Sequence, residues 1–353
     1  MLKKMNKNTK NNLITYGIVI AAFIIMQTLI STGSISSLME GLMVPLCIYI
    51  ILAVSLNLVV GILGELSLGH AGFMCVGAFT SAFFSKCMRD VITIAPLRFI
   101  LALLIGMAVA AVFGIIIGIP VLRLKGDYLA IVTLAFGEII KNLVNVLFIG
   151  KDSNGFHFST KDVMDLNMEA DGTVLVNGPQ GITGTPKDST FLIGVILILI
   201  TLFIVINMIN SRDGRAIMAI RDNRIAAESV GINVTKYKLM AFTVSAALAG
   251  AAGVLYAHNL STLTANTNNF GYNMSINILV FVVLGGIGSI RGSMIAAVIL
   301  TLLPELLRGL SDYRMLIYAI VLILMMLFNW SPKAIEWREK YLSFGKKKKE
   351  AVK

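Results

Sequence analysis

The feature that most constrains this chain is a series of long apolar stretches that contain almost no charged residues. Hydrophobic residues make up 57% of the sequence and charged residues 14%, whereas soluble domains typically have about 25% charged residues. Too few polar side chains remain to cover an aqueous surface, so lipid must be part of the solvent. This excludes a soluble enzyme, a disordered chain and a disulfide scaffold. It predicts an all-α, polytopic membrane helix bundle.

The apolar stretches give the expected number of crossings, since about 20 apolar residues span the hydrocarbon core of a bilayer. We predict ten spans, at 13–30, 42–63, 72–85, 99–121, 128–148, 191–209, 239–258, 275–288, 293–308 and 315–330. The first follows several lysines, as a signal peptide does. Its apolar part is longer than that of a usual signal sequence, however, and no A-x-A cleavage site follows it. We therefore expect a retained first helix.

The charge distribution predicts the orientation, because Lys and Arg are enriched in cytoplasmic loops. The N-terminal segment 1–12, the segment 210–238 and the tail 331–353 are basic, so all three are expected in the cytoplasm. The 150–190 segment is acidic and the 259–274 loop is uncharged, so both are expected outside. Ten crossings within a transmembrane domain at 13–330, with both termini cytoplasmic, satisfy these assignments. Orientation thus accounts for the net charge of +11, and no nucleic-acid partner is predicted.

Ten spans divide into two sets of five, and an odd number in each half gives the halves opposite orientations. The third span of each half is short and is bordered by glycines. These helix-turn glycines are Gly64, Gly69, Gly72, Gly285, Gly286 and Gly288. Interrupted segments at corresponding places in two halves are typical of a translocation path. We predict a 5+5 inverted repeat, and a re-entrant segment is the alternative to a complete third crossing.

The stretch from Ser211 to Val234 is too polar to cross a membrane, although its composition favours a helix. Its apolar residues, among them Ile217 and Ile220, form one face, and Arg and Asp side chains occupy the other. Such a helix lies along the cytoplasmic surface. It either docks into a groove of a partner or anchors the bundle at the membrane interface. Residue spacing alone leaves both interpretations open.

The fifth span carries four polar residues on one helical face, because their spacing is i, i+3, i+4, i+7. They are Glu138, Lys141, Asn142 and Asn145. Ionisable groups within a membrane are costly unless they are paired or hydrated, so this stripe is expected to face the bundle interior or an aqueous cavity. Glu138 and Lys141 are also spaced to form an ion pair. A lining of the translocation path and a buried pair that fixes helix packing are the two interpretations.

The segment 64–72 places Glu65, Ser67 and His70 in a glycine-rich turn. Ser67 and His70 lack the elbow or oxyanion motif of a hydrolase, so they are expected to satisfy backbone groups or to line the path. No second His or Cys stands at metal-ligand spacing, so no metal site is predicted. No G-x-x-x-x-G-K-[ST] motif occurs, so neither Walker-type ATP binding nor any cofactor is expected. The three cysteines are interpreted as free buried thiols.

Several motifs in order along the chain resemble one family. They are LNLVVGILGELSLGHAGFMCVGAF (56–79), LRLKGDYLAIVTLAFGEII (122–140), NGPQGITGTP (177–186), the 211–234 stretch, SINILVFVVLGGIGSIRG (275–292) and LLPELLR (302–308). The sequence is similar to permease subunits of branched-chain amino acid ABC transporters, of the LivM type, over roughly residues 50–330.

The resemblance implies an importer in the cell membrane of a bacterium or archaeon. Its expected partners are a second, LivH-like permease subunit, two ABC ATPase subunits and an extracytoplasmic substrate-binding protein, which would meet NGPQGITGTP. Residues 210–234 then correspond to the cytoplasmic coupling loop that docks on an ATPase. The family pattern there is EAA, three residues and Gly, and this chain has Ile225 in place of the acid. The expected coupling residues are Arg215, Arg221, Ala226, Ala227 and Gly231.

Two other functions remain open at the level of sequence. Related permeases move urea, other amides, other amino acids or sugars, because a separate binding protein usually sets specificity. An autonomous transporter coupled to protons through Glu138 and His70 belongs to a different class. An intramembrane enzyme would need a nucleophile–base pair or a metal cluster, and neither is recognisable.

Overall fold

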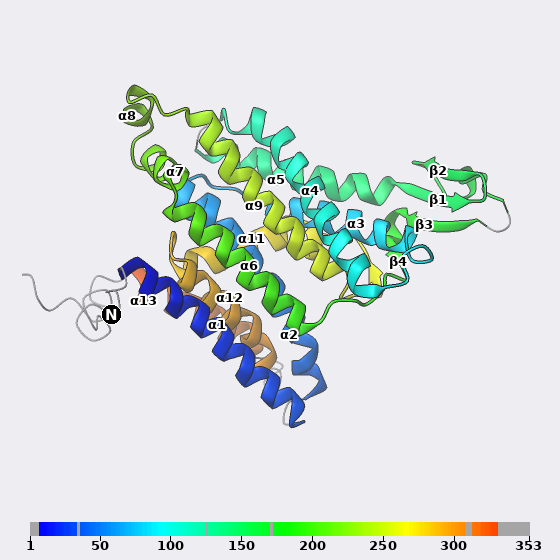
Figure 1. Ribbon diagram of the computed structural model, residues 1–353, viewed down its shortest axis with the longest axis horizontal. Helices are drawn as coiled ribbons and strands as arrows, with labels where there is room; N and C mark the ends of the chain where they lie inside the picture. Colours follow the sequence, from blue (N-terminus) through cyan, green and yellow to red (C-terminus); the bar gives the residue numbers. More distant parts are fainter. Residues whose placement is uncertain (1–6, 34–35, 125, 170–171, 308–312, 331–353) are drawn as a thin grey trace, which may run out of the picture.

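The computed structural model describes residues 7–33, 36–124, 126–169, 172–307 and 313–330, and most of them are helical (Figure 1). The tail 331–353 and the first six residues lie outside this described part. The first five long helices are α1 (Lys7–Ser31), α2 (Ser37–Asn57), α3 (His70–Cys87), α4 (Ala95–Val121) and α5 (Asp127–Val146). A π-helical turn, Leu58–Leu63, directly extends α2.

The second set of helices follows the acidic segment. It comprises α6 (Phe191–Asn210), α7 (Arg212–Asp222), α8 (Arg224–Ser229), α9 (Val234–Ala257), α10 (Thr267–Phe270), α11 (Tyr272–Gly285), α12 (Ile290–Leu306) and α13 (Arg314–Trp330). Each of the ten predicted spans coincides with one of the long helices of the two sets. Six helices of the described part are long and apolar enough to cross a membrane, namely α1, α2 with its π-helical turn, α4, α5, α6 and α9. A mostly helical bundle with several candidate spans is thus confirmed.

The predicted all-α fold needs correction in the 150–190 segment. Strands β1 (Phe148–Asp152), β2 (Gly155–Ser159) and β3 (Thr173–Asn177) form an antiparallel sheet in the order β2-β1-β3. Further along, β4 (Ile182–Thr183) pairs with β5 (Thr262–Leu263). Short runs rich in β-branched residues, such as Thr173–Asn177, favour strands outside the membrane, where a sheet edge can be hydrated.

Asp152 organises the hairpin between β1 and β2. Its Oδ1 accepts hydrogen bonds from the backbone N–H groups of Asn154 (2.9 Å) and Gly155 (3.1 Å), and its Oδ2 lies 2.9 Å from the His157 ring. Burial works against ionisation of Asp152. Backbone N–H groups of Glu169 and Asn154, together with His157, outweigh that effect and lower the pKa of the carboxyl below its ordinary value. The hairpin is therefore closed by an ionised side chain at neutral pH.

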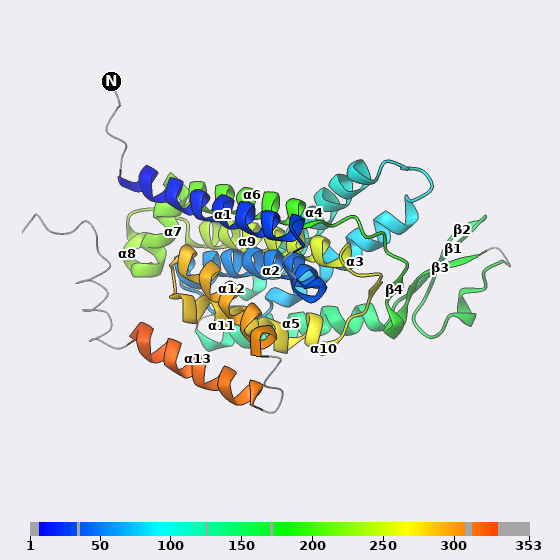
Figure 2. The ribbon, with the colours of Figure 1, turned by 90° about the horizontal axis from the view of Figure 1, so that it is seen from below.

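The two ends of the bundle differ in structure (Figures 1 and 2). Helices α7 and α8 lie at one end, together with the first turn of α1 and the last turn of α13, and the sheet lies at the other. We call these the α7–α8 end and the sheet end. The β4–β5 pair joins the 150–190 segment to the 259–274 loop, and Lys86 Nζ donates to the carbonyl oxygen of Val174 at 2.8 Å. Lys86 thus lies at the sheet end, together with the two segments that were predicted to be external, 150–190 and 259–274.

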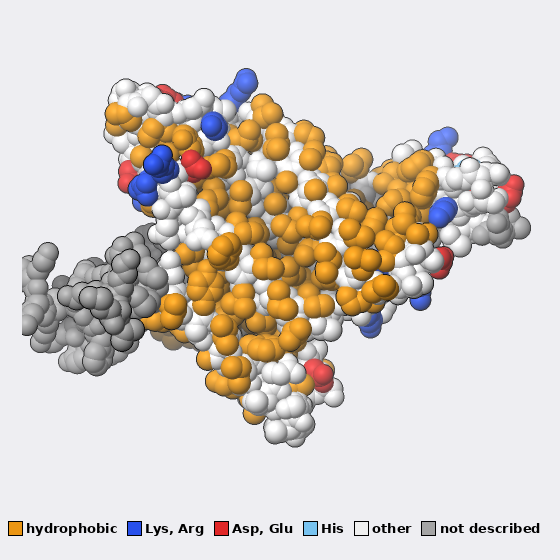
Figure 3. Space-filling model, viewed as in Figure 1, with side chains coloured by type: hydrophobic (Ala, Val, Ile, Leu, Met, Phe, Trp, Pro, Cys, Tyr) orange, Lys and Arg blue, Asp and Glu red, His pale blue; other side chains and the backbone are white. Residues whose placement is uncertain are grey.

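The side-chain distribution agrees with a lipid environment. Hydrophobic side chains cover the middle of the molecule, whereas charged side chains gather at its two ends (Figure 3). Large apolar side chains on the lateral helices are open to the surroundings, for example Ile116 on α4 (58% exposed) and Phe203 on α6 (61% exposed). Exposed apolar surface of this extent is stable only against hydrocarbon or a protein partner.

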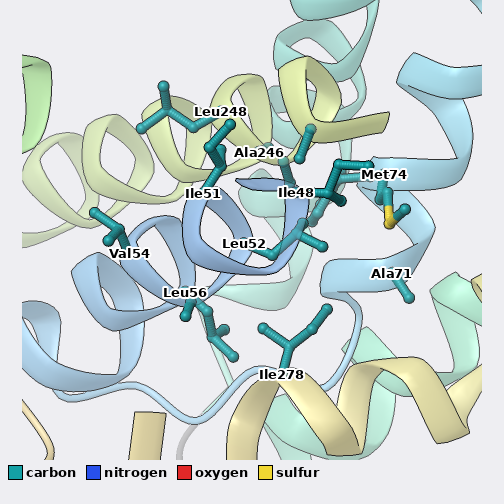
Figure 4. Packing of buried hydrophobic residues seen from close by; sticks show 14 of the residues in the cluster. Ile48, Ile51, Leu52, Val54, Leu56, Ala71, Met74, Ala246, Leu248 and Ile278 are labelled. Carbon is teal, nitrogen blue, oxygen red and sulfur yellow. The ribbon is translucent and has the colours of Figure 1, made fainter. Parts of the chain in front are cut away.

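The core of the bundle is built on α2 and α9, which pack against α3 and α11. Ile48, Ile51, Leu52 and Leu56 of α2 are fully buried, and they lie among side chains of α3, α9 and α11 (Figure 4). Small residues of α9 allow the closest approaches. A Cβ atom on Gly77 of α3 would lie 2.4 Å from the carbonyl oxygen of Gly250. Membrane helices approach closely through such small residues.

Gly77→Val should therefore destabilise the bundle, because the added side chain overlaps the α9 backbone. The expected cost is about 1–3 kcal/mol, measured as a lower melting temperature in detergent by fluorescence-detected size exclusion. Gly17→Val is the matched control, since no atom lies within 4 Å of a Cβ built on this α1 glycine. Equal melting temperatures for the two variants would contradict the α3–α9 contact.

Candidate translocation and coupling site

The glycine-bordered segments of the two halves meet at the α7–α8 end. A Cβ atom on Gly61, in the π-helical turn, would lie 2.4 Å from the backbone nitrogen of Gly288, so only glycine fits there. Asn57 links the same elements, because its Oδ1 accepts from Gly288 N at 2.9 Å and its Nδ2 donates to Ser293 Oγ at 2.8 Å. The turn that follows α11, with Gly285, Gly286 and Gly288, is thus docked directly on the end of α2.

Residues 64–69 are non-helical and return from the α7–α8 end into the bundle. Glu65 forms an ion pair with Lys238 of α9. Leu68 N donates to Thr133 Oγ1 of α5 at 3.0 Å. Gly69 and Gly72 lie against Thr133 and Gly137, where a larger side chain would overlap the α5 backbone. The glycines therefore allow a non-helical segment to lie between helices, with the Glu65 carboxylate and the Leu68 N–H bonded to α9 and α5.

His70 and Ser67 are buried at the start of α3. His70 Nε2 lies 2.7 Å from Ser55 Oγ of α2. The next residue, Ala71, donates its N–H to Ser275 Oγ of α11 at 3.2 Å. Ser67 Oγ is buried and has no hydrogen-bond partner within the described residues. These contacts tie the start of α3 to both halves of the chain, and Ser67 supplies an unsatisfied hydroxyl beside that junction.

The polar stripe of α5 holds the segment that leads into α11. Glu138 pairs with Lys141, and Glu138 Oε1 accepts from the backbone N–H of Tyr272, the first residue of α11, at 2.8 Å. Lys141 Nζ donates to Thr267 Oγ1 at 3.2 Å. Asn145 Nδ2 donates to the carbonyl oxygen of Ala265 at 3.0 Å. A carboxylate at a helix N-terminus is favourable, because it meets unsatisfied N–H groups and the positive end of the helix dipole.

This geometry bears on the two interpretations of the stripe. The Lys141 side chain is 9% exposed and that of Glu138 is 25% exposed, so the pair is largely enclosed. Asn142, by contrast, is exposed. Glu138, Lys141 and Asn145 each make a hydrogen bond to residues 265–272. This favours a packing role for these three residues.

The 211–234 stretch forms two short helices rather than one. Asn223 lies in an extended conformation between α7 and α8, and its Oδ1 accepts from Ala226 N at 3.0 Å as the N-cap of α8. Ser211 caps α7 and Asn233 caps α9 in the same way. An asparagine that can bond to its own backbone competes with a continuous helix. The single surface helix expected from composition is therefore divided at this residue.

Arg221 joins the α7–α8 segment to the membrane helices. Its Nη1 donates to the carbonyl oxygen of Gly61 at 3.0 Å, and its Nη2 pairs with Asp222 at 2.9 Å. A Cβ atom on Gly64 would lie 2.5 Å from the aliphatic part of Arg221, so the side chain lies across the end of the π-helical turn. The residue predicted to meet an ATPase thus makes an internal contact at the Gly61–Gly288 junction.

The other predicted coupling residues divide between the two faces of the segment. Ala227 is buried in a small cluster with Ile220 and Val234. Arg215, Ala226 and Gly231 are exposed. Ile225 and Val230, on and just after α8, are 80% and 74% exposed. Two exposed apolar side chains on one short segment, which also carries the exposed Arg224–Glu228 ion pair, favour a surface that meets another protein.

Comparison with known proteins identifies the family. The model for the family described as branched-chain amino acid transport system / permease component matches residues 38–328. This chain belongs to that family. Within it, the high-affinity branched-chain amino acid permease LivM of Salmonella typhimurium is 37% identical over 298 residues, covering 82% of this chain and 67% of the relative.

More distant relatives are also permeases. LivH of Salmonella typhimurium is 24% identical over 286 residues, which covers 79% of this permease and 88% of LivH. The ribose import permease RbsC of Escherichia coli is 28% identical over 292 residues, with coverages of 79% and 81%. No solved structure matches the chain.

Four polar residues that hold the start of α3 and the turn after α11 were not predicted from the sequence. Asn57, Ser55, Ser275 and Ser293 each bond across two helices, and all four are buried. A usable signal was present, since each is a polar residue in or beside an apolar stretch. Within the described part of the permease, no group of three His, Cys, Asp or Glu side chains is arranged to hold a metal ion.

The two interpretations of the α5 stripe give different results in a mutant cycle. Glu138→Gln leaves the Lys141 charge enclosed without a counter-charge, at an expected cost of about 3–5 kcal/mol in stability. Adding Lys141→Met should recover much of that loss, measured as melting temperature and yield of monodisperse permease. Asn142→Ala is the control on the same face and should have little effect. If Glu138→Gln instead leaves stability intact and abolishes uptake, the stripe lines the path.

Proposed function

We propose that this chain is the membrane-spanning permease subunit of an ABC importer that moves branched-chain amino acids and is driven by separate ATPase subunits. The observation that carries the proposal is the 37% identity to LivM over 82% of the chain. The exposed apolar pair on the α7–α8 segment supports docking to another subunit. The chain itself is not an enzyme, because its role is to open and close a path while ATP is hydrolysed elsewhere.

The topology we propose is ten crossings in the cell membrane of a bacterium or archaeon, with both termini in the cytoplasm. Helices α3 and α11 are shorter than a membrane is thick, but each follows a segment that completes the distance. Residues 64–69, which are non-helical, enter from the α7–α8 end, and residues 264–271, which contain the short helix α10, enter from the sheet end and lie along α5 from Asn145 to Glu138. The third span of each half is thus interrupted, and the two interruptions lie at opposite ends of the bundle. This arrangement supports a 5+5 inverted repeat.

We assign the partners from the charge at each end of the bundle and from the similarity to LivH. The α7–α8 end carries the basic coupling segment and is proposed to face the cytoplasm and the ATPase subunits. The sheet end, with the acidic 150–190 segment and NGPQGITGTP, is proposed to meet an extracytoplasmic binding protein. A second, LivH-like permease completes the path, and the similarity of this chain to LivH supports a pair of related subunits.

Arg221 is the proposed transmission point between the ATPase and the path. It contacts Gly61, and Gly61 contacts Gly288, so a displacement of α7 and α8 reaches both the π-helical turn before residues 64–69 and the turn after α11 over two contacts. The segments are held by discrete hydrogen bonds rather than by continuous helix. They can therefore exchange between two packed arrangements, and nucleotide binding can shift the balance between them.

Ser67 and Asn142 are the residues that we propose to line the path. Ser67, with its unsatisfied hydroxyl, and the exposed Asn142 are placed to meet a polar solute. His70, Glu138, Lys141 and Asn145 are bonded within the bundle, and we propose that they position the interrupted segments around the path. These internal bonds also weigh against a proton-coupled transporter that uses Glu138 and His70. A sugar cargo is the second candidate, on the 28% identity to the ribose permease.

Reconstitution tests the proposed function directly. Vesicles that contain this permease with its permease partner, ATPase subunits and binding protein should accumulate labelled leucine, isoleucine or valine only when ATP is supplied. Vesicles with this chain alone under a proton gradient should accumulate none. Accumulation by the chain alone would contradict the ABC importer, and uptake of ribose in preference to leucine would contradict the cargo.

Docking of the α7–α8 segment is tested at Gly231. This exposed residue has φ +85°, and no atom lies within 4 Å of a Cβ built on it. Gly231→Arg should leave the chain in the membrane but weaken ATPase docking and uptake by about tenfold or more. Gly231→Ala is the matched control, because it imposes the same backbone strain of about 1–2 kcal/mol without the bulk. Equal uptake by both variants would refute docking at this position.

Transmission through Arg221 gives a different signature. Arg221→Ala removes a charged hydrogen bond worth about 1.5–3 kcal/mol, so uptake per ATP hydrolysed should fall by about tenfold while the ATPase subunits remain bound. Arg212→Ala, an exposed arginine at the start of the same helix, is the control and should transport normally. Normal coupling in Arg221→Ala would contradict the proposed transmission point.

A further inference from the structure

Helix α1 lies at the edge of the bundle, beside a hydrocarbon-lined groove. The groove has a volume of about 440 Å³ and lies between α1, α2, α6 and α12. Every side chain that lines it is apolar or a thiol, with Ala22 on α1, Cys47 on α2 and Val298 on α12 among them. Only 6% of the residues in the apolar stretch of α1 are buried, against 89% in the apolar stretch of α2 with its π-helical turn. Packing with the described part of the chain therefore leaves most of α1 uncovered.

Two contacts hold α1 against the bundle beside this groove. The rings of Phe23 and Phe191 lie 5.4 Å apart, which joins α1 to α6. Arg291 Nε donates to Thr15 Oγ1 at 2.5 Å, which joins α1 to α12. Thr15 lies one turn before Ile18 and Arg291 one turn before Met294, and Ile18 and Met294 both line the groove. The hydrogen bond therefore closes the groove at the α7–α8 end.

The lining of the groove disfavours water, and leaving the groove empty costs packing energy. An apolar cavity of about 150 Å³ already excludes water and takes up small hydrocarbons, and this groove is larger and offers almost no polar partner. An unfilled space would also forfeit the dispersion contacts of all the side chains around it. A hydrocarbon occupant satisfies both conditions.

We propose that the groove binds an acyl chain of a membrane phospholipid, which forms part of the packing between α1 and the bundle. A helix from a partner subunit fits less well. With its side chains a helix is about 10–12 Å wide, whereas Thr15–Arg291 and Phe23–Phe191 hold α1 in direct contact with α12 and α6. A single acyl chain is narrow enough to lie between the helices and is supplied by the surrounding bilayer. This site goes beyond the transport function and does not depend on the cargo.

The wild-type protein provides the first test, in vesicles that contain a phospholipid with a photoreactive diazirine in its acyl chain. After illumination, digestion and mass spectrometry should place the label mainly on 18–26 and 294–302, which line the groove. The lipid-exposed face of α4, including Ile115 and Ile116, should receive several-fold less label. An even distribution over all exposed helices would overturn the proposal.

A matched pair of variants provides the second test. Ala22→Trp fills the groove, whereas Ala21→Trp adds the same bulk at a neighbouring α1 residue that does not line it. Native mass spectrometry of the permease with its partners should show one retained phospholipid fewer for Ala22→Trp alone, at equal monodispersity. Equal lipid retention in both variants would overturn the proposal. So would loss of a partner subunit from Ala22→Trp without loss of lipid, because a protein would then be the occupant.

Discussion

The structure depends on one constraint: inside hydrocarbon, every polar group must find a partner within the protein. Residues 64–69, and residues 264–271 with the short helix α10, are bonded to side chains from other helices, and Ser67 Oγ is the exception among the side chains of the first segment. Thr133 accepts a hydrogen bond from an N–H group of the first segment, and Ser275 accepts one from an N–H group at the start of α3. Glu138 and Asn145 bond to the second segment and the start of α11. These four polar side chains therefore lie where helices are interrupted.

The same constraint links local structure to transport. A segment held by separate side-chain bonds can exchange partners, whereas a continuous membrane helix cannot do so without exposing its backbone. Gly61, just before residues 64–69, touches Gly288 in the turn after α11, and Arg221 joins that contact to the coupling segment. One of the two interruptions of the proposed path thus lies at the junction with the surface that is proposed to receive the driving force.

Much of the fold was predictable from the sequence, because apolar length and charge asymmetry are local properties. The ten apolar stretches became helices. Of the four residues predicted to share one face of α5, Glu138, Lys141 and Asn145 bond to residues 265–272, whereas Asn142 is exposed. The sheet at 148–177 was missed, since five-residue strands carry a weak pattern beside long apolar runs. The division of the coupling stretch at Asn223 was also missed, because a capping asparagine and a tolerated helical asparagine look alike in sequence.

The sequence by itself determined that lipid is the solvent, where the helices lie and which face of α5 is polar. Only the tertiary structure decided what those residues contact. Asn57 bonds to Gly288 and Ser293, Glu138 to Tyr272, and Arg221 to Gly61. Each of these pairs joins residues more than 130 positions apart. Such contacts follow from how helices pack in three dimensions, and no local pattern of hydrophobicity or charge encodes that packing.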